Sequence, residues 1–142
     1  MGSKDSRIKA LRRVPLLSGL STKDLEHVLE IGKDQEFVPG LAIVTAGDRA
    51  KDFYLLLAGK ARLTVPGRRT ATLGPGDYFG EMSVLDGGPR SATIVAQTLV
   101  SCLRIGRSDF LKLLDAHGSI GRKILVEMSK RVRAAEKPPD RH

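Results

Sequence analysis

The sequence predicts an α+β fold, in which an antiparallel β-roll (a jelly-roll-like double sheet) is flanked by N-terminal helices and two C-terminal helices. Helical periodicity is confined to the two ends of the chain, whereas the middle consists of short β-type runs separated by glycine and proline. Many short strands with turns between them are typical of sandwiches and barrels rather than of parallel sheets. The 142 residues show no internal repeat and suffice for one domain with one modest core.

We place this domain at residues 10–135, between a flexible basic N-terminus at 1–9 and a disordered tail at 136–142. The first expected element is a short basic helix over Ser6–Arg13. It should end before Pro15, because the residue that precedes a proline avoids the helical region.

A second helix is expected to begin with a capping box at Ser21–Asp24 and to end at Gly32. Its apolar positions repeat on one helical face and consist of Leu25, Val28 and Leu29. The pattern then changes to seven β-type runs, which are Gln35–Val38, Leu41–Thr45, Phe53–Ala58, Ala61–Val65, Thr70–Leu73, Ser91–Ala96 and Leu99–Ile105.

Two turns between these runs have specific chemistry. Pro66-Gly67 is expected at a hairpin tip, because proline fixes one turn torsion and glycine supplies a positive one. Leu73–Asp77 contains Gly-Pro-Gly and predicts a second sharp turn that delivers Phe79 and Gly80 into a pocket.

Two helices should close the fold. Ser108 is expected to cap the first, which His117-Gly118 ends. The last helix is expected from Ile120 up to Pro138-Pro139, with basic residues around its apolar positions. The apolar positions of the two helices are Leu111, Leu113 and Leu114, and then Ile124, Leu125, Met128 and Val132.

Composition limits the setting and the partners. The single Cys102 excludes an internal disulfide, and its apolar strand predicts a buried, inert thiol. No apolar run is long enough to cross a bilayer and no signal peptide is recognisable, so we expect a cytoplasmic protein. The net charge of +8 favours anionic partners in general.

The most informative segment is Phe79–Thr93, which joins a glycine turn, a carboxylate and an arginine. Glu81 and Arg90 lie nine positions apart in this segment. Arginine presents a planar fork of donors that matches phosphate oxygens, and an ionised carboxylate can accept hydrogen bonds from a sugar hydroxyl. An ordinary structural ion pair between Glu81 and Arg90 is the alternative interpretation.

This segment resembles the phosphate-binding cassette of the cyclic nucleotide-binding domain family. The anchors of that pattern are present in register as Phe79, Gly80, Glu81, Met82, Leu85, Arg90, Ser91, Ala92 and Thr93. The likeness covers about residues 10–135 and extends to sensor domains of catabolite activators, kinase regulatory subunits and cyclic-nucleotide-gated channels. In pattern the chain is closest to bacterial members of the family.

The resemblance implies a role for each residue of the cassette. Glu81 should accept hydrogen bonds from the ribose 2′-hydroxyl, with Gly80 and Met82 on the ribose side of the ligand. Arg90 should neutralise the cyclic phosphate, with Ser91 and Ala92 completing the donor shell. The purine is expected to rest on Leu63 and Val65, and Arg131 of the last helix to stack over the base.

The ligand implied is 3′,5′-cyclic AMP, with cyclic GMP as the alternative. Ser91 does not separate the two, because a hydroxyl after the arginine can bond guanine but also occurs in bacterial cyclic AMP binders. Binding should draw the last helix over the pocket and so act on an attached effector domain or an acidic protein partner. The basic residues of that helix are Arg122, Lys123, Lys130, Arg131 and Arg133.

Other classes of function have less support in the sequence. His27, His117 and His142 are scattered, and we find no catalytic constellation, no metal-binding set and no cofactor motif. The main rival is the sensor half of a catabolite-activator-type transcription regulator; no DNA-recognition helix is expected in these residues, and we expect no nucleic-acid contact from them. A ligand-free interaction module with a degenerate pocket is the remaining alternative.

Overall fold

The structure is a computed structural model that describes residues 3–67 and 70–136. Its helices are α1 (Lys4–Arg12), the 3-10 helix η1 (Pro15–Leu17), α2 (Thr22–Ile31), α3 (Glu81–Asp86), α4 (Arg107–Ala116) and α5 (Gly118–Glu136). Its strands are β1 (Gly32–Phe37), β2 (Ala42–Val44), β3 (Phe53–Ala58), β4 (Ala61–Thr64), β5 (Thr70–Leu73), β6 (Tyr78–Phe79), β7 (Thr93–Ala96) and β8 (Val100–Ile105). The predicted fold class is confirmed.

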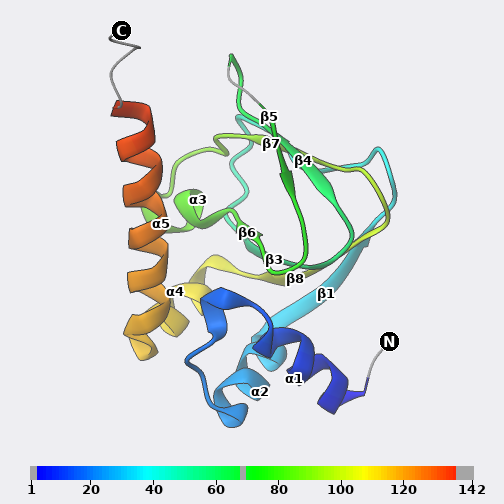
Figure 1. The fold of residues 1–142 in the computed structure, drawn as a ribbon, viewed down its shortest axis with the longest axis vertical. Helices are drawn as coiled ribbons and strands as arrows, with labels where there is room; N and C mark the ends of the chain where they lie inside the picture. Colours follow the sequence, from blue (N-terminus) through cyan, green and yellow to red (C-terminus); the bar gives the residue numbers. More distant parts are fainter. Residues whose placement is uncertain (1–2, 68–69, 137–142) are drawn as a thin grey trace, which may run out of the picture.

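The strands form two antiparallel sheets of four strands each. One has the order β1-β8-β3-β6 and the other β2-β7-β4-β5. The chain crosses from one sheet to the other several times, as Figure 1 shows for the central green and yellow segments. Only β4 and β5 are consecutive strands of the same sheet, and every other connection leads to the opposite sheet. Helix α3 is inserted between β6 and β7.

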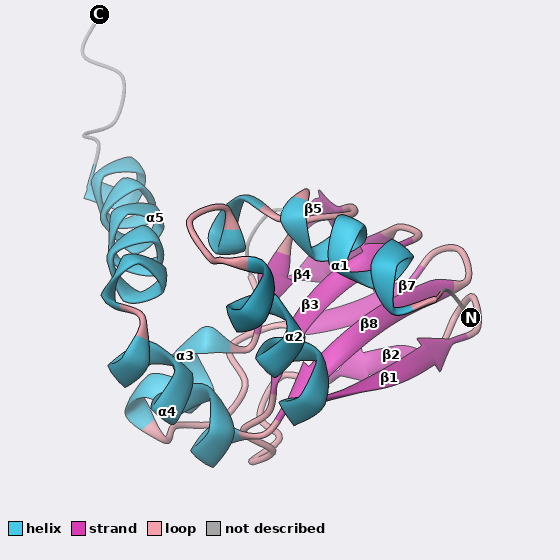
Figure 2. Ribbon diagram, turned by 90° about the horizontal axis from the view of Figure 1, so that it is seen from below, coloured by secondary structure: helices cyan, strands magenta, loops and turns pink. Residues whose placement is uncertain are grey.

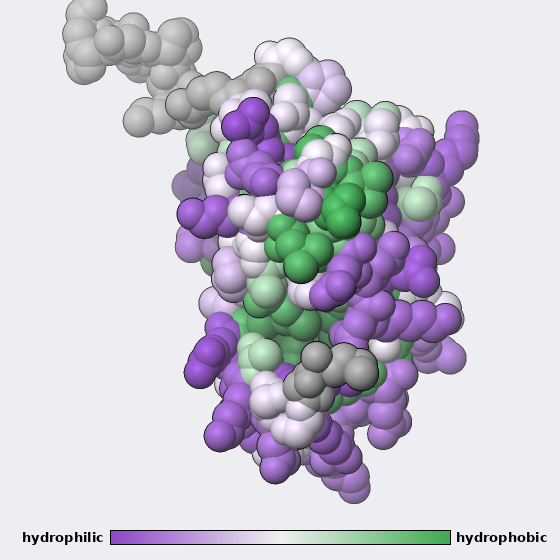
Figure 3. Space-filling view, turned by 90° about the vertical axis from the view of Figure 1, so that its right-hand side faces the viewer, coloured by the Kyte–Doolittle hydropathy of each residue, from purple (hydrophilic) through white to green (hydrophobic). Residues whose placement is uncertain are grey.

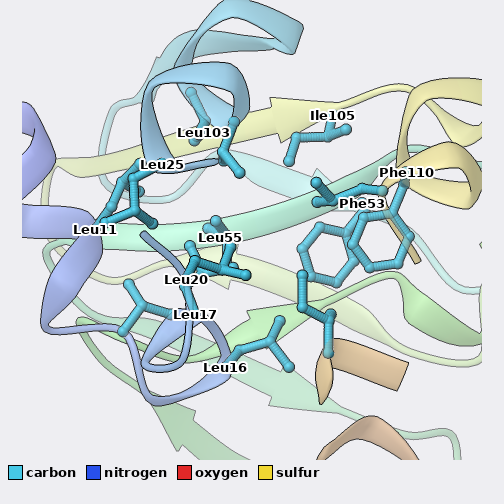
Figure 4. Close-up of a cluster of buried hydrophobic side chains, with 14 of the residues drawn as sticks. Leu11, Leu16, Leu17, Leu20, Leu25, Phe53, Leu55, Leu103, Ile105 and Phe110 are labelled. Atoms are coloured by element: carbon cyan, nitrogen blue, oxygen red, sulfur yellow. The ribbon is translucent and has the colours of Figure 1, made fainter. Parts of the chain in front are cut away.

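The core has two layers, which explains why β3 is a continuous apolar run rather than an alternating one. Phe53 and Leu55 face the helices, and Tyr54 and Leu56 face the interior of the roll. On the helix side the ring of Phe53 stacks on that of Phe110 in α4, with centroids 3.9 Å apart and planes at 13° (Figure 4). A strand buried on both faces needs apolar residues at every position.

The interior layer also contains the single thiol. Cys102 is 1% exposed, as the sequence predicted, and desolvation raises the pKa of its thiol to about 12. The prediction of a buried cysteine is confirmed.

The first helix begins earlier than expected. α1 begins at Lys4, after an N-cap at Ser3, and it buries Ile8 and Leu11 against the core. Residues 4–9 are therefore helical rather than a flexible extension, because α1 contributes apolar side chains to the core. The capping box of α2 is formed as predicted, with Ser21 and Asp24 each accepting from the other's backbone N–H.

Gly32 ends α2 as predicted, but it is also the first residue of β1, which starts three residues earlier than expected. The strand starts there because Gly32 already pairs with Ile105 of β8. The packing is close, since a Cβ on Gly32 would lie 2.5 Å from Cγ of Leu103. The turn at Pro66-Gly67 has the predicted positive φ of 74° at Gly67.

Two predictions for the C-terminal helices are wrong. Gly106, not Ser108, is the N-cap of α4, because its extended backbone already accepts from the N–H of Phe110 at 2.9 Å. His117 is the C-cap of α4, but Gly118 begins α5 two residues before the expected Ile120. The helices are thus separated by one residue. Pro138-Pro139 and residues 137–142 lie outside the described residues, and Glu136 is the last residue of α5.

Helix α5 lies beside the β-roll rather than across it, as Figure 2 shows from below. Over the described residues, no helix combines the length and apolarity that a membrane span requires. Three short elements were not anticipated as such: η1, β6 and α3. Their lengths of three, two and six residues are below what periodicity can detect.

An apolar patch lies on the side of the roll opposite α5. Val38, Leu41 and Leu99 are 60%, 48% and 53% exposed, in the loops that join β1 to β2 and β7 to β8. Figure 3, which views the right-hand side of Figure 1, shows hydrophobic side chains gathered among hydrophilic ones. These residues do not line the cavity described next.

Candidate functional site

A cavity of about 550 Å³ lies where the β2-β7-β4-β5 sheet meets α3 and α5. All nine predicted ligand contacts line it, namely Leu63, Val65, Gly80, Glu81, Met82, Arg90, Ser91, Ala92 and Arg131. They come from four separate parts of the chain, so the fold alone brings them together. A single cavity of this size is within the range of about 300–1,000 Å³ typical of small-molecule sites.

Arg90 forms the cationic end of the cavity. Its backbone is fixed by two hydrogen bonds, from its N–H to the carbonyl of Asp48 at 2.7 Å and from the N–H of Gly47 to its own carbonyl at 2.9 Å. The residue is only 5% exposed, and Nε, Nη1 and Nη2 have no hydrogen-bond partner among the described residues. Desolvation lowers the pKa of this guanidinium from its ordinary value. The buried fork of donors is therefore available to an anion in the cavity.

The aromatic ring of Tyr54 lies behind this guanidinium. Cζ of Arg90 is 5.9 Å from the ring centroid, a cation–π distance. Tyr54 in turn stacks on Phe79, with centroids 5.0 Å apart and planes at 11°. The rings hold the arginine from the side of the roll interior without occupying its N–H groups.

Gly80 lies directly against Arg90 and cannot be another residue without movement. It has φ of +90° and is the N-cap of α3. A Cβ on Gly80 would lie 2.7 Å from Nη1 of Arg90 and 2.5 Å from the carbonyl oxygen of Asp52. Both the left-handed backbone and the close approach therefore require glycine here.

Glu81, the first residue of α3, supplies the carboxylate and is 4% exposed. Its Oε2 lies 3.2 Å from Nη1 of Arg131 on α5. No hydrogen bond or ion pair joins Glu81 to Arg90, both of which the structure describes. The ordinary ion pair considered as an alternative is therefore not formed. Arg131, expected over the base, instead contacts the predicted ribose-binding carboxylate.

The two remaining cassette positions have different environments. Ser91 is exposed, and its hydroxyl donates to Sδ of Met82 at 3.8 Å. Ala92 is 9% exposed, so its small side chain lies in the wall of the cavity. The hydroxyl of Ser91 is thus held by a weak sulfur acceptor that a stronger acceptor can displace.

The apolar wall of the cavity is larger than predicted. Besides Leu63 and Val65, it includes five residues that we did not single out, namely Val44, Ala71, Leu73, Tyr78 and Ile94. Alternation along β4, β5 and β7 marks these positions as facing one side of a sheet, but it does not say which side carries the cavity. Tyr78 lies between this wall and the helix-side core, where burial raises the pKa of its phenol to about 12.

Two arginines outside the cavity support it and were not anticipated. Nε of Arg107 in α4 donates to the carbonyl of Val84 at 2.8 Å, which satisfies an acceptor in the last turn of α3. Nη1 of Arg104 in β8 lies 3.4 Å from Oδ2 of Asp52, whose carbonyl lies against Gly80. These contacts tie α3 and the Gly80 turn to the rest of the fold.

The cavity combines three kinds of group that can recognise a ligand. Arg90 offers unpaired guanidinium donors, Glu81 offers an acceptor carboxylate, and most of the other lining residues are apolar. Across the described part of the chain, no three His, Cys, Asp or Glu side chains are grouped as a metal site would require. The arrangement suits a small anion that also carries a hydroxyl and an apolar ring system.

Comparison with known proteins agrees with this arrangement. A sequence profile described as the cyclic nucleotide-binding domain matches residues 34–117. A cAMP-dependent protein kinase regulatory subunit from Yarrowia lipolytica is 37% identical over 73% of this chain and 28% of its own length. A cyclic AMP receptor protein from Thermus thermophilus is 35% identical over 86% of this chain and 59% of its own length.

A solved structure supports the same fold. It is a complex described as Sp-2Cl-cAMPS bound to PKAR CBD2, with a TM-score of 0.78 and 28% identity over 94% of each chain. The chain spans less than two thirds of the length of both curated relatives. Because the fungal and bacterial proteins match at similar identity, the comparisons do not single out bacterial members of the family.

Proposed function

The chain belongs to the cyclic nucleotide-binding domain family, and from that premise we propose that it is a non-catalytic sensor that binds 3′,5′-cyclic AMP. Cyclic GMP is the alternative ligand. We propose further that binding acts through α5 on an effector domain or an acidic protein partner, in the cytoplasm. The relatives named above support cyclic AMP as the first ligand to test, since their names or complexes include it.

The unpaired guanidinium of Arg90 is the observation that carries this proposal. A buried donor without a partner costs about 1–3 kcal/mol, and more when it is charged. A fold keeps a buried donor without a partner when a bound ligand supplies the missing acceptor. The cyclic phosphate has one negative charge and exposed oxygens, so it fits the fork of donors that Arg90 presents in a mostly apolar cavity.

The other parts of a cyclic nucleotide also find matching groups. Only one carboxylate oxygen of Glu81 is engaged by Arg131, so the other can accept from the ribose 2′-hydroxyl, which stays free in a 3′,5′-cyclic nucleotide. Gly80 and Met82 lie beside this carboxylate, and Ser91 and Ala92 beside the phosphate end. The purine would rest on the apolar wall that includes Leu63 and Val65.

Arg131 would couple the ligand to α5. The Glu81 carboxylate that would accept from the ribose also lies 3.2 Å from Nη1 of Arg131 on α5. The ligand and α5 would therefore bind the same carboxylate. A nucleotide shifts the position of α5 only if it makes better contacts in one position than in the other. The exposed basic face of α5 then offers a surface for an acidic partner.

Two alternatives stay open to the same experiment. The sensor half of a catabolite-activator-type regulator would bind the same ligand at the same site. It would differ from the proposed sensor only in the domain attached to it. A ligand-free interaction module would not bind a cyclic nucleotide. The unpaired Arg90 favours the sensor over the module, because a buried cation is unfavourable unless an anion pairs with it.

The test is titration calorimetry of the purified chain with cyclic AMP and cyclic GMP, beside Arg90→Ala and the control Arg133→Ala. Arg133 is an exposed arginine of α5 outside the cavity. We expect the unaltered chain to bind. Arg90→Ala should lose about 2–5 kcal/mol of binding free energy, and Arg133→Ala should bind like the unaltered chain. Equal binding by both variants would contradict the assigned phosphate site, and no binding of either nucleotide to the unaltered chain would favour the interaction module.

A further inference from the structure

We propose that the crevice between α5 and η1 is a second ligand site, for a small amphipathic anion. It is a cavity of about 630 Å³ on the side of α5 that faces η1 and the β5–β6 turn. It adjoins the nucleotide cavity, with which it shares Leu73, Tyr78 and Arg131. Figure 2 shows α5 standing beside the roll. The cyclic nucleotide proposal uses the shared Arg131 as the link to α5, but no ligand contact from the residues that line this crevice alone, such as Arg122, Lys123 and Val126.

Two contacts hold α5 at the ends of the crevice. At one end Nζ of Lys123 donates to the carbonyl of Pro15 at 3.1 Å and to the hydroxyl of Ser18 at 2.7 Å. At the other end Arg131 is paired with Glu81. Lys123 and Arg131 are eight residues apart, which is about 12 Å along a helix. A helix fixed at two points keeps the space between them open.

The walls of the crevice combine apolar surface with positive charge. Leu16, Leu73, Val126 and the ring of Tyr78 supply the apolar part. Arg122, Lys123 and Arg131 supply three cationic groups, against two carboxylates.

Two of the charged groups that line the crevice have partners of opposite charge. Glu127 lies 3.3 Å from Nζ of Lys130, and Arg131 is paired with Glu81. Asp77 accepts from the N–H of Gly74 at 2.7 Å, a neutral donor that leaves its charge in place. Arg122 and Lys123 therefore remain against Asp77, which is an excess of positive charge.

These features define the chemical class of the ligand. A cavity of this size with mostly apolar walls suits a molecule with an aromatic or aliphatic body. Its acidic group would lie against Arg122, and the phenol of Tyr78 stays protonated at neutral pH because its pKa is about 12. The positive charge of Arg122 and Lys123 would repel a cationic ligand and attract an anionic one. The geometry thus selects an organic carboxylate, sulfonate or similar anion.

The test uses 8-anilinonaphthalene-1-sulfonate, whose fluorescence rises in apolar surroundings, and three substitutions that each insert one carboxylate at an exposed position. Val126→Glu places it in the crevice, Leu125→Glu on the neighbouring residue of α5 outside both cavities, and Ser91→Glu in the nucleotide cavity only. We expect saturable dye binding that Val126→Glu weakens by at least about tenfold, because like charges repel in a site of low polarity. The other two should stay within about twofold of the unaltered chain.

Val126→Glu could disturb the helix, and thermal unfolding followed by circular dichroism would reveal this. A second pair of variants covers that case. Arg122→Gln removes the cation but leaves the apolar wall, and Arg133→Gln is its control outside the crevice. We expect weaker dye binding in the first and unchanged binding in the second. The proposal is overturned if the chain shows no saturable binding, if Val126→Glu and Arg122→Gln both bind like their controls, or if Ser91→Glu alone removes binding. No cyclic nucleotide is used, so this outcome is independent of the proposed function.

Discussion

Nη1 of Arg131 on the last helix lies 3.2 Å from Oε2 of Glu81, the carboxylate at the start of α3. The two residues are fifty positions apart in the chain. The arginine is 58% exposed at its side chain and the glutamate only 6%, so a surface helix reaches a buried acceptor inside the cavity. This contact is the direct link between α5 and the proposed nucleotide site.

Arg131→Ala tests that link. If the same carboxylate anchors both α5 and the ribose, removing the arginine should weaken cyclic AMP binding by about tenfold, at the lower end of the usual coupling between two sites. Arg133→Ala, on the same helix but outside the cavity, should bind like the unaltered chain. Calorimetric titration measures both. Tighter binding by Arg131→Ala would instead mean that the arginine competes with the ligand for Glu81.

Gly80→Ala should disturb the site in two ways, by a steric clash with Arg90 and by strain in a backbone with positive φ. The new methyl group would lie 2.7 Å from Nη1 of Arg90, which must then move. Gly40→Ala is a matched control, because Gly40 has the same φ of +90° but nothing within 4 Å of an added Cβ.

Both glycine variants should lose about 1–3 kcal/mol of stability from left-handed strain, measured by urea unfolding. Only Gly80→Ala should also lose ligand affinity. Equal affinity in the two variants would show that the position of Arg90 does not depend on the glycine beside it.

Arg90→Met should stabilise the nucleotide-free fold but abolish ligand binding. Without nucleotide, the buried guanidinium has no hydrogen-bond partner among the described residues. Replacing it with an apolar side chain of similar length should therefore raise the free energy of unfolding by about 1–3 kcal/mol. The same variant should not bind cyclic AMP. A lower midpoint of thermal unfolding in the nucleotide-free variant would show that Arg90 stabilises the empty fold.

Arg90→Lys should keep the charge and still fail to bind tightly. Lysine has no planar fork, so it cannot satisfy two phosphate oxygens at once. We expect an affinity loss approaching that of Arg90→Met in the same calorimetric assay. Near-normal binding by the lysine variant would mean that charge alone, and not geometry, retains the phosphate.

Cys102 should be unreactive in the folded protein. Its side chain is buried in the roll interior, and desolvation raises the pKa of the thiol to about 12. At pH 8 the thiolate is then about one part in ten thousand, and thiolate is the reactive form. Ellman's reagent should react with the chain in urea at the rate of a free cysteine and hardly at all without urea. Rapid reaction of the native chain would show local opening of β8.

Acid should weaken the capping box of α2. Hydrogen bonding to Ser21 lowers the pKa of the Asp24 carboxyl in the folded state. A folded pKa below the unfolded one gives stability that is present above the unfolded value of about 3.9 and is lost as the pH falls through the folded value.

Asp24→Asn should therefore lower the melting temperature at pH 7 and narrow the difference between pH 7 and pH 3. The effect should be absent in Asp109→Asn, an acidic residue in the first turn of α4 for which no capping box is formed. An unchanged pH dependence in Asp24→Asn would assign the acid sensitivity to other carboxylates.

The sequence by itself determined the β-roll, the boundaries of several strands and the identities of the cassette residues. Strands β3 and β5 have the predicted ends, because the apolar run of the first and the glycine and proline turns around the second are local signals. The cassette could be found because its glycine, glutamate and arginine match the family pattern in register within fifteen residues. Helix α3 escaped because six residues are too few to show a helical period. The N-cap of α4 was misplaced because Gly106 caps it without a side chain, whereas Ser108 is a residue type that usually caps helices.

Only the tertiary structure decided which distant groups meet. Spacing along the chain left open an ion pair between Glu81 and Arg90 as the alternative, whereas the fold places Arg131 against Glu81 and leaves Arg90 buried without a hydrogen-bond partner among the described residues. The position of α5 depends on contacts at both of its ends, through Lys123 to η1 and through Arg131 to α3. Such contacts join residues fifty or a hundred positions apart, where chain closure and packing, rather than local propensity, set the geometry.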